Sequence, residues 1–157
     1  MGNGNWYTGT GKKISFNDIV EIVSKHSKQE GSIYVGSDSI KQKSECIFCT
    51  AICLLGETDQ SNRYFIKREK DSIKNHKILI QRITTEVQNS IDIGLKLLYH
   101  CPSIKIELHI DVGNSSKGSK TSKFADMLVG YAEGNGFKCK TKPEAFAAYC
   151  VADRHSR

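Results

Sequence analysis

The chain has 157 residues, a formal net charge of +6, 38% hydrophobic residues, 25% charged residues and two prolines. At about 100 to 150 residues per domain, this length holds one core of sheet and helices and excludes a second catalytic domain. No run reaches the ~18 to 20 consecutive apolar residues that span a bilayer, and the first 13 residues lack the apolar core of a signal peptide. We therefore expect a cytoplasmic protein without a membrane anchor.

The six cysteines and the positive net charge indicate which bonds and which binding partners to expect. Without a secretory signal, free buried thiols are expected rather than disulfides. Cys46, Cys49 and Cys53 have a spacing that could hold zinc, but on a strand Cys46 and Cys49 point to opposite faces, so zinc is the weaker reading. The pI near 9.0 favours a polyanionic partner, above all nucleic acid.

The N-terminal part predicts an arm followed by a helix. Residues 1–13 are rich in Gly and Asn and predict a flexible N-terminal arm, after which 14–157 form a single domain. Apolar residues at helical spacing predict a helix over 15–31, with Ser15 or Asn17 as N-cap and Gly31 as its stop.

Three strands and the longest helix follow. Runs of β-branched, aromatic and Cys residues separated by polar turns predict strands over 32–39, 44–57 and 62–70, joined as an antiparallel meander. From about Ile73 to Leu98 the apolar residues repeat at steps of three and four, which is typical of an amphipathic helix.

The C-terminal third alternates strands and helices. Residues 103–113 alternate as a fourth strand, 123–136 form a helix closed by glycines, and 137–142 form a fifth strand. The Ala-rich stretch 144–157 predicts a final helix opened by Pro143. A meander followed by strand–helix units implies a mixed sheet, antiparallel on one side and parallel on the other, with helices on its faces.

Two aspartates close apolar strands. Asp38 ends the first strand and Asp111 ends the fourth, and the carboxyl ends of neighbouring parallel strands meet at a crevice where ligands bind. Adjacent carboxylates repel unless a cation compensates them, and all-oxygen clusters suit Mg²⁺ or Mn²⁺, often as two ions ~3.5 to 4 Å apart. The alternative is that each Asp only ends a strand and caps a loop. Glu86 in the long helix and Asp153 in the last helix could complete the cluster; otherwise they are solvated surface charges.

Four segments carry a family resemblance. IYVGSDS, RITTEVQNS, HIDVG and FADMLVGYAEGNGFKCKTKPEAFAAYCVADRHS, in this order, resemble the YkuK-like (DUF458) family of the ribonuclease H-like superfamily over residues 14 to 157. The resemblance implies an α/β, ribonuclease H-like five-stranded mixed sheet of order 3-2-1-4-5 with helices on both faces, and a carboxylate cluster for two divalent ions. Position by position it implies metal ligands at Asp38, Glu86, Asp111 and Asp153.

Other polar residues near these ends are candidate contacts. His109 precedes Asp111 by two positions and would share its face, where it either touches substrate or packs between strand and helix. His155 could pass a proton to a leaving oxygen. Ser39, beside Asp38, is a further candidate substrate contact.

Several lysines lie in the loop and the strand that follow Asp111. Lys117 and Lys120, in the loop, and Lys142, at the end of the fifth strand, could hold a phosphate backbone, although a solvated basic face is the alternative. The loop sequence GNSSKGSKT also approaches a P-loop, but Ser119 intrudes between Gly118 and Lys120 and would displace that lysine from the phosphates.

Together these features predict a nuclease that depends on Mg²⁺ or Mn²⁺ and hydrolyses phosphodiester bonds in RNA, an RNA–DNA hybrid or structured DNA. Asp38, Glu86, Asp111, Asp153 and His155 are its expected catalytic residues. The alternatives are a non-catalytic nucleic-acid-binding module on the same fold and, more remotely, a P-loop NTPase. The sequence leaves the oligomeric state open.

Overall fold

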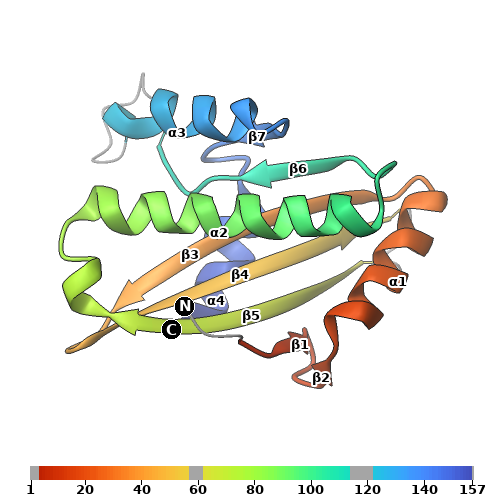
Figure 1. Cartoon of the computed structure of the whole chain (residues 1–157), viewed down its shortest axis with the longest axis horizontal. Coiled ribbons are helices and arrows are strands. Elements are labelled where there is room, and N and C mark those ends of the chain that lie inside the picture. Colours follow the sequence, from red (N-terminus) through yellow and green to blue (C-terminus); the bar gives the residue numbers. More distant parts are fainter. Residues whose placement is uncertain (1–3, 57–61, 114–121, 157) are drawn as a thin grey trace.

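A mixed sheet with strand order β2-β1-β5-β4-β3-β6-β7 lies at the centre of the protein (Figure 1). The computed structural model describes residues 4–56, 62–113 and 122–156. The strands are β1 (Trp6–Thr8), β2 (Lys13–Ile14), β3 (Ser32–Lys41), β4 (Glu45–Leu55), β5 (Arg63–Ser72), β6 (Ile106–His109) and β7 (Lys138–Lys140). The described helices are α1 (Phe16–Lys28), the 3-10 helix η2 (Ile73–Asn75), α2 (Leu79–His100), α3 (Ser122–Gly134), the π-helical η4 (Ala147–Ala152) and α4 (Asp153–Ser156).

The five strands expected from the sequence have the expected order. β3, β4 and β5 form the antiparallel meander, and β6 and β7 extend it on the other side of β3 as parallel strands. Numbered as the sequence predicted them, these strands run 3-2-1-4-5, so the mixed α/β fold class is confirmed.

The sheet has seven strands rather than the five expected, because the N-terminal segment adds two. β1 pairs antiparallel with the outer edge of β5 and then with β2. Trp6 is 6% exposed and packs on Phe16 of α1, with ring centroids 6.0 Å apart. One buried indole thus brings a Gly- and Asn-rich segment onto an edge strand that would otherwise be open. Within the described part of the expected arm, residues 4–13, Trp6–Thr8 and Lys13 therefore belong to the sheet.

The first helix begins where the sequence predicts and ends slightly earlier. The Ser15 hydroxyl accepts a hydrogen bond from the Asp18 amide at 3.1 Å, which is the expected N-cap. The chain leaves the helix through Glu30 at φ 58°, not through Gly31. Gly31 is needed for space instead, since a Cβ there would stand 2.1 Å from Nε2 of the His26 ring.

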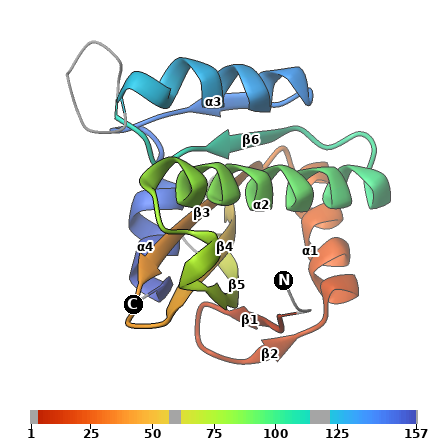
Figure 2. The ribbon, with the colours of Figure 1, turned by 60° about the vertical axis from the view of Figure 1, so that its left-hand side comes forward.

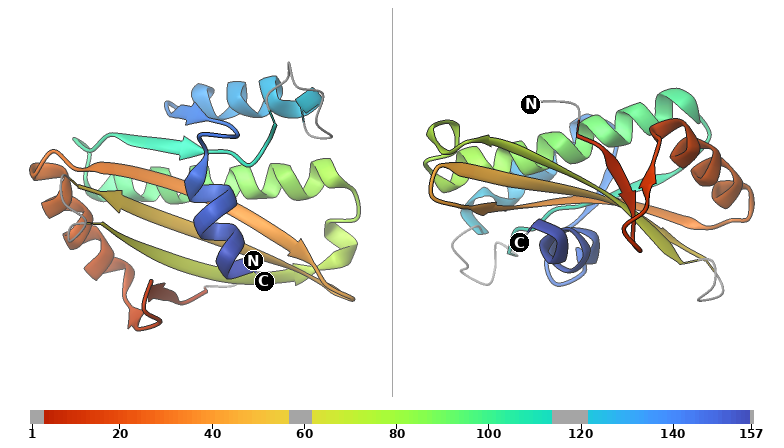
Figure 3. Two further views of the ribbon diagram at one scale, coloured as in Figure 1. Left: turned by 180° about the vertical axis from the view of Figure 1, so that it is seen from behind. Right: turned by 90° about the horizontal axis from the view of Figure 1, so that it is seen from below.

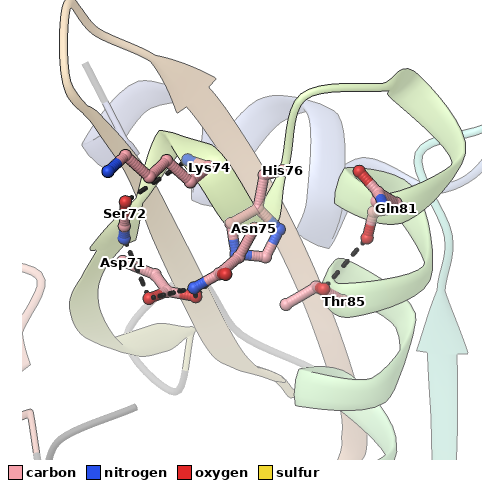
Figure 4. A network of polar contacts seen from close by, with 7 residues as sticks. All are labelled: Asp71, Ser72, Lys74, Asn75, His76, Gln81 and Thr85. Atoms are coloured by element: carbon pink, nitrogen blue, oxygen red, sulfur yellow. Dashed lines mark hydrogen bonds and ion pairs between the residues drawn. The ribbon is translucent and has the colours of Figure 1, made fainter.

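The longest helix starts at Leu79 rather than near Ile73, and a polar network fills the turn before it (Figure 4). Nε2 of His76 lies 2.7 Å from Oδ2 of Asp71, and the Asn75 amide donates to the same carboxylate. The hydrogen bond with His76 lowers the pKa of Asp71. The His76 ring is buried against Phe48, so the turn is anchored to the sheet before α2 begins.

The helices divide the core into two parts, one on each face of the sheet (Figures 2 and 3). α1 and α2 cover the face on which Ile33, Val35 and Ile52 point inward. The last helix, η4 continued by α4, crosses the opposite face over Cys49 and Ala51.

The cysteines whose side chains are described are free thiols: Cys46, Cys49, Cys53, Cys101 and Cys139. Cys46 and Cys49 are buried in β4, where their three-residue separation directs them to opposite faces as the sequence analysis argued. Burial raises the pKa of Cys49 to about 12, which is typical of a packed thiol. In the three described ranges, no helix has both the length and the apolar character needed to cross a membrane.

Candidate carboxylate site

The strand register brings Asp38 and Asp111 to the same level of the sheet. The parallel ladder between β3 and β6 ends at the pair Gly36 and His109. Asp38 and Asp111 each lie two residues beyond that pair. Asp38 does not end its strand as expected, because β3 continues to Lys41 through its pairing with β4. β6 is shorter than the predicted fourth strand, so Asp111 follows the strand instead of ending it.

Asp38 is buried among other acids. Its side chain points to the face under the last helix, is 7% exposed, and accepts a hydrogen bond from Oγ of Ser156 at 3.4 Å. Burial, then the charge of Glu86 and hydrogen-bonding contacts with Asp153 and Asp111, raise the pKa of Asp38 to about 9. Asp38 therefore interacts with all three other carboxylates expected at the site.

Glu86 reaches the same edge from α2. It is 6% exposed, although it lies in a helix whose other face is solvated, and Oγ of Ser39 donates a hydrogen bond to its Oε1. Burial raises the pKa of Glu86 to about 8, opposed by the Ser39 hydrogen bond. Ser39, expected as a substrate contact, thus holds a carboxylate of the cluster.

Lys142 lies beside Asp111. The chain returns from β7 along the segment after β6, with the Lys142 amide donating to the Val112 carbonyl at 3.0 Å. Nζ of Lys142 then stands 2.8 Å from Oδ1 of Asp111, and this contact raises the pKa of Lys142. The lysine side chain is 48% exposed, so its ammonium faces both the cluster and solvent.

Asp153 arrives on the last helix, and the sequence analysis did not identify the two residues that position that helix. Gly36 lets it cross β3 closely, since a Cβ at Gly36 would lie 2.6 Å from the backbone nitrogen of Ala148. The Ser156 hydroxyl shares its one proton between the Asp153 carbonyl, at 3.0 Å, and Oδ2 of Asp38, at 3.4 Å. The only sequence signals were a small residue inside a strand and a hydroxyl one turn after Asp153.

His109 is a packed residue rather than an open one. Its ring is 1% exposed between Tyr34 and Phe146. Nδ1 accepts from the Ala147 amide at 3.1 Å, which leaves Nε2 to donate to Glu107 at 3.2 Å. Burial lowers the pKa of His109, which agrees with this neutral form. The described contacts match the packing alternative and use both nitrogens.

His155 lies at β5. Its Nε2 is 2.9 Å from the hydroxyl of Tyr64, and the two rings are 5.4 Å apart. Burial, followed by the charges of Arg154 and Arg68, lowers the pKa of His155. Lys117 and Lys120, together with most of the P-loop-like sequence, lie in 114–121, outside the described residues.

The carboxylates are neighbours without being a ready-made metal cage. Among the described residues, no three His, Cys, Asp or Glu side chains are arranged to hold a metal ion. Three of the carboxylates instead have a polar partner of another kind: Glu86 accepts from Ser39, Asp111 pairs with Lys142, and Asp38 accepts from Ser156. Burial first, and then the charge of a neighbouring carboxylate, raise the pKa of both Asp38 and Glu86.

Comparison with known proteins gives one finding. A protein-family model described as Ribonuclease H-like matches residues 15–157. Searches of curated proteins and of solved structures return no significant match.

Proposed function

Because the chain belongs to the ribonuclease H-like family, we propose that it is a nuclease that hydrolyses phosphodiester bonds with the help of divalent cations. Its substrate would be RNA, an RNA–DNA hybrid or structured DNA. The match over residues 15–157 is consistent with the YkuK-like branch, and we include that finer placement in the proposal.

One observation carries the proposal: Asp38 and Asp111, each two residues beyond the last β3–β6 pair, contact each other, and the charge of the buried Glu86 acts on Asp38. The donor set fits Mg²⁺ or Mn²⁺, since all four acids offer hard carboxylate oxygens and a like-charged cluster favours a cation. Asp38, Glu86, Asp111 and Asp153 would hold two such ions. When bound, they would supply an activated water and charge compensation for the leaving oxygen.

The chain's own residues would prepare the reaction. Ser39 donates to one oxygen of Glu86 and Ser156 donates to one oxygen of Asp38, so these two hydroxyls would orient the carboxylates. The half-exposed ammonium of Lys142 would contact a phosphate oxygen of the bound strand. Hydrolysis joins the water oxygen to phosphorus, breaks the bond to the 3′ oxygen, and transfers a proton from water to that oxygen.

A cleavage assay tests the proposal. End-labelled single-stranded RNA, RNA–DNA hybrid, duplex DNA and branched DNA are incubated with Mg²⁺, Mn²⁺ or EDTA. We expect cutting by the wild type with a metal, none in EDTA, and none by Asp38→Asn or Asp111→Asn. Asp126→Asn, which removes the same charge from the exposed side of α3, is the matched control and should cut normally. Equal cutting by Asp38→Asn would refute the proposal.

A second candidate is a binding module that keeps the fold without turnover. The observation in its favour is that Lys142 already neutralises Asp111 at 2.8 Å. It predicts salt-dependent nucleic-acid binding that is the same in EDTA, in Mg²⁺ and in Asp38→Asn, with no substrate cut.

A further inference from the structure

A second cluster of polar and basic side chains lies at β5, apart from the carboxylates. It surrounds a hollow of about 630 Å³, within the roughly 300 to 1,000 Å³ that small-ligand pockets occupy. The hollow is lined by Gly4, Asn5, Tyr7, Ile66, Arg68, Arg154 and His155. These residues come from β1 and the two residues before it, from β5 and from the last helix, which Figure 3 shows crossing the sheet toward β5.

The hollow combines two features that recognise a nucleotide. Arg68 and Arg154 are exposed, and neither guanidinium has an ion pair or side-chain hydrogen bond with a residue of the described ranges. Tyr7 is 37% exposed although it sits in a strand, and it lines the same hollow as the two arginines. Guanidinium groups bind phosphate oxygens through paired donors, and an open aromatic ring stacks on a base.

Strand register relates this hollow to the carboxylates. Asp38 pairs with Cys49 across β3 and β4, and Cys49 pairs with Arg68 across β4 and β5, so Asp38 and Arg68 lie on one rung and one face. At about 4.8 Å per strand their backbones are roughly 10 Å apart. The last helix crosses this face over Cys49, between the two residues, so a bound strand would pass around that helix. At about 3.4 Å per nucleotide, roughly three nucleotides is the shortest connection.

From this arrangement we propose that the hollow binds a nucleotide of the substrate strand a few residues away from the scissile phosphate. Arg68 and Arg154 hold its phosphate, and Tyr7 stacks on its base. Since a base is free to stack only where it is unpaired, the substrate has a single-stranded stretch at this point. The ligand class rests on the proposed nuclease function, whereas the test below does not require cleavage.

Binding is measured by fluorescence anisotropy with a labelled single-stranded 12-mer in EDTA, over a series of salt concentrations. Each of Arg68→Gln and Arg154→Gln should weaken binding and reduce the slope of log K against log salt by about 0.7, the value for one phosphate contact on a single strand. The matched control is Arg63→Gln, on the same strand but the opposite face, paired with the core residue Leu54. It should change neither quantity.

The proposed stacking of a base on Tyr7 is tested separately. Tyr7→Ala should lower the affinity about five-fold or more while leaving the salt slope unchanged, and Tyr7→Phe should retain wild-type affinity. An abasic 12-mer should remove the difference between wild type and Tyr7→Ala.

The outcomes separate this inference from the nuclease proposal. Wild-type binding and slope in both Arg68→Gln and Arg154→Gln, or an equal loss in Arg63→Gln, would overturn the hollow as a nucleotide site. If those variants behave as expected but nothing is cut, only the nuclease proposal fails.

Discussion

Replacing Asp38 with Asn should stabilise the protein while it abolishes cleavage. The pKa of this carboxyl is raised from 3.8 to about 9, mainly by burial and by Glu86. The folded protein thus keeps a proton that the unfolded chain releases above about pH 4. Each pH unit between the two pKa values therefore lowers the free energy of unfolding by about 1.4 kcal/mol. Between pH 4 and pH 7 the cost reaches roughly 4 kcal/mol, a ceiling that local relaxation and coupling to Glu86 reduce.

The direction of this pKa shift predicts how the stability of the protein depends on pH. Because the folded-state pKa of the acid is raised, the wild type loses stability as pH rises from about 4 toward 9. Asn carries no charge at any pH, and its side-chain oxygen can still accept from Ser156. We therefore expect little difference between Asp38→Asn and the wild type at pH 4.5, and a difference that favours the variant by at least ~1 kcal/mol at pH 8, which is about 2 to 4 °C in Tm.

Thermal and urea denaturation in EDTA, at half-unit steps from pH 4.5 to 8.5, measure this difference. Asp126→Asn, exposed on α3, controls for the loss of one negative charge from a basic protein. A stability gain that is flat with pH, or Asp38→Asn less stable than wild type at pH 8, would refute the argument that Asp38 is a buried, repelled carboxylate. Added Mg²⁺ should raise the Tm of the wild type more than that of the variant.

Two further predictions concern the neighbours of the cluster. Lys142→Met removes the cation 2.8 Å from Asp111. Because this lysine is half-exposed, the loss of stability in EDTA should be about 0.5 to 1 kcal/mol, and Mg²⁺ should restore the stability in thermal melts. No loss in EDTA would mean that the ion pair does not contribute to stability. Gly36→Ala places a Cβ against the backbone of Ala148 and should cost about 1 to 3 kcal/mol in urea unfolding and reduce cleavage. Gly130→Ala in α3, where a Cβ meets nothing within 4 Å, should be neutral or stabilising, and equal losses in both would argue against a specific contact.

The parts of the site that depend on strand ends were predictable. Asp38 and Asp111 each follow an apolar run in the sequence, and the parallel pairing of these two segments brings them together, although β3 itself continues past Asp38 to Lys41. Glu86 was predictable only as a candidate, because helical spacing shows which side of α2 is apolar but not that Ser39 would take one of its oxygens. The prediction that His109 and Asp111 share a face rested on the alternation of side chains along a strand. Because β6 ends at His109, that alternation does not extend to Asp111.

The amino-acid pattern by itself determined the elements whose signals are local: the first helix, with its cap at Ser15 or Asn17, the three-stranded meander, the long amphipathic helix and the strand–helix units that imply a mixed sheet. Tertiary structure alone decided what depends on approach between distant segments. Trp6 makes a strand of a Gly- and Asn-rich segment only because β5 offers an open edge. Likewise Arg68 and Arg154, which are 86 positions apart, line one hollow only because the last helix crosses the sheet. The spacing of apolar residues predicts single helices and strands, and it does not predict contacts between segments that are distant in the sequence.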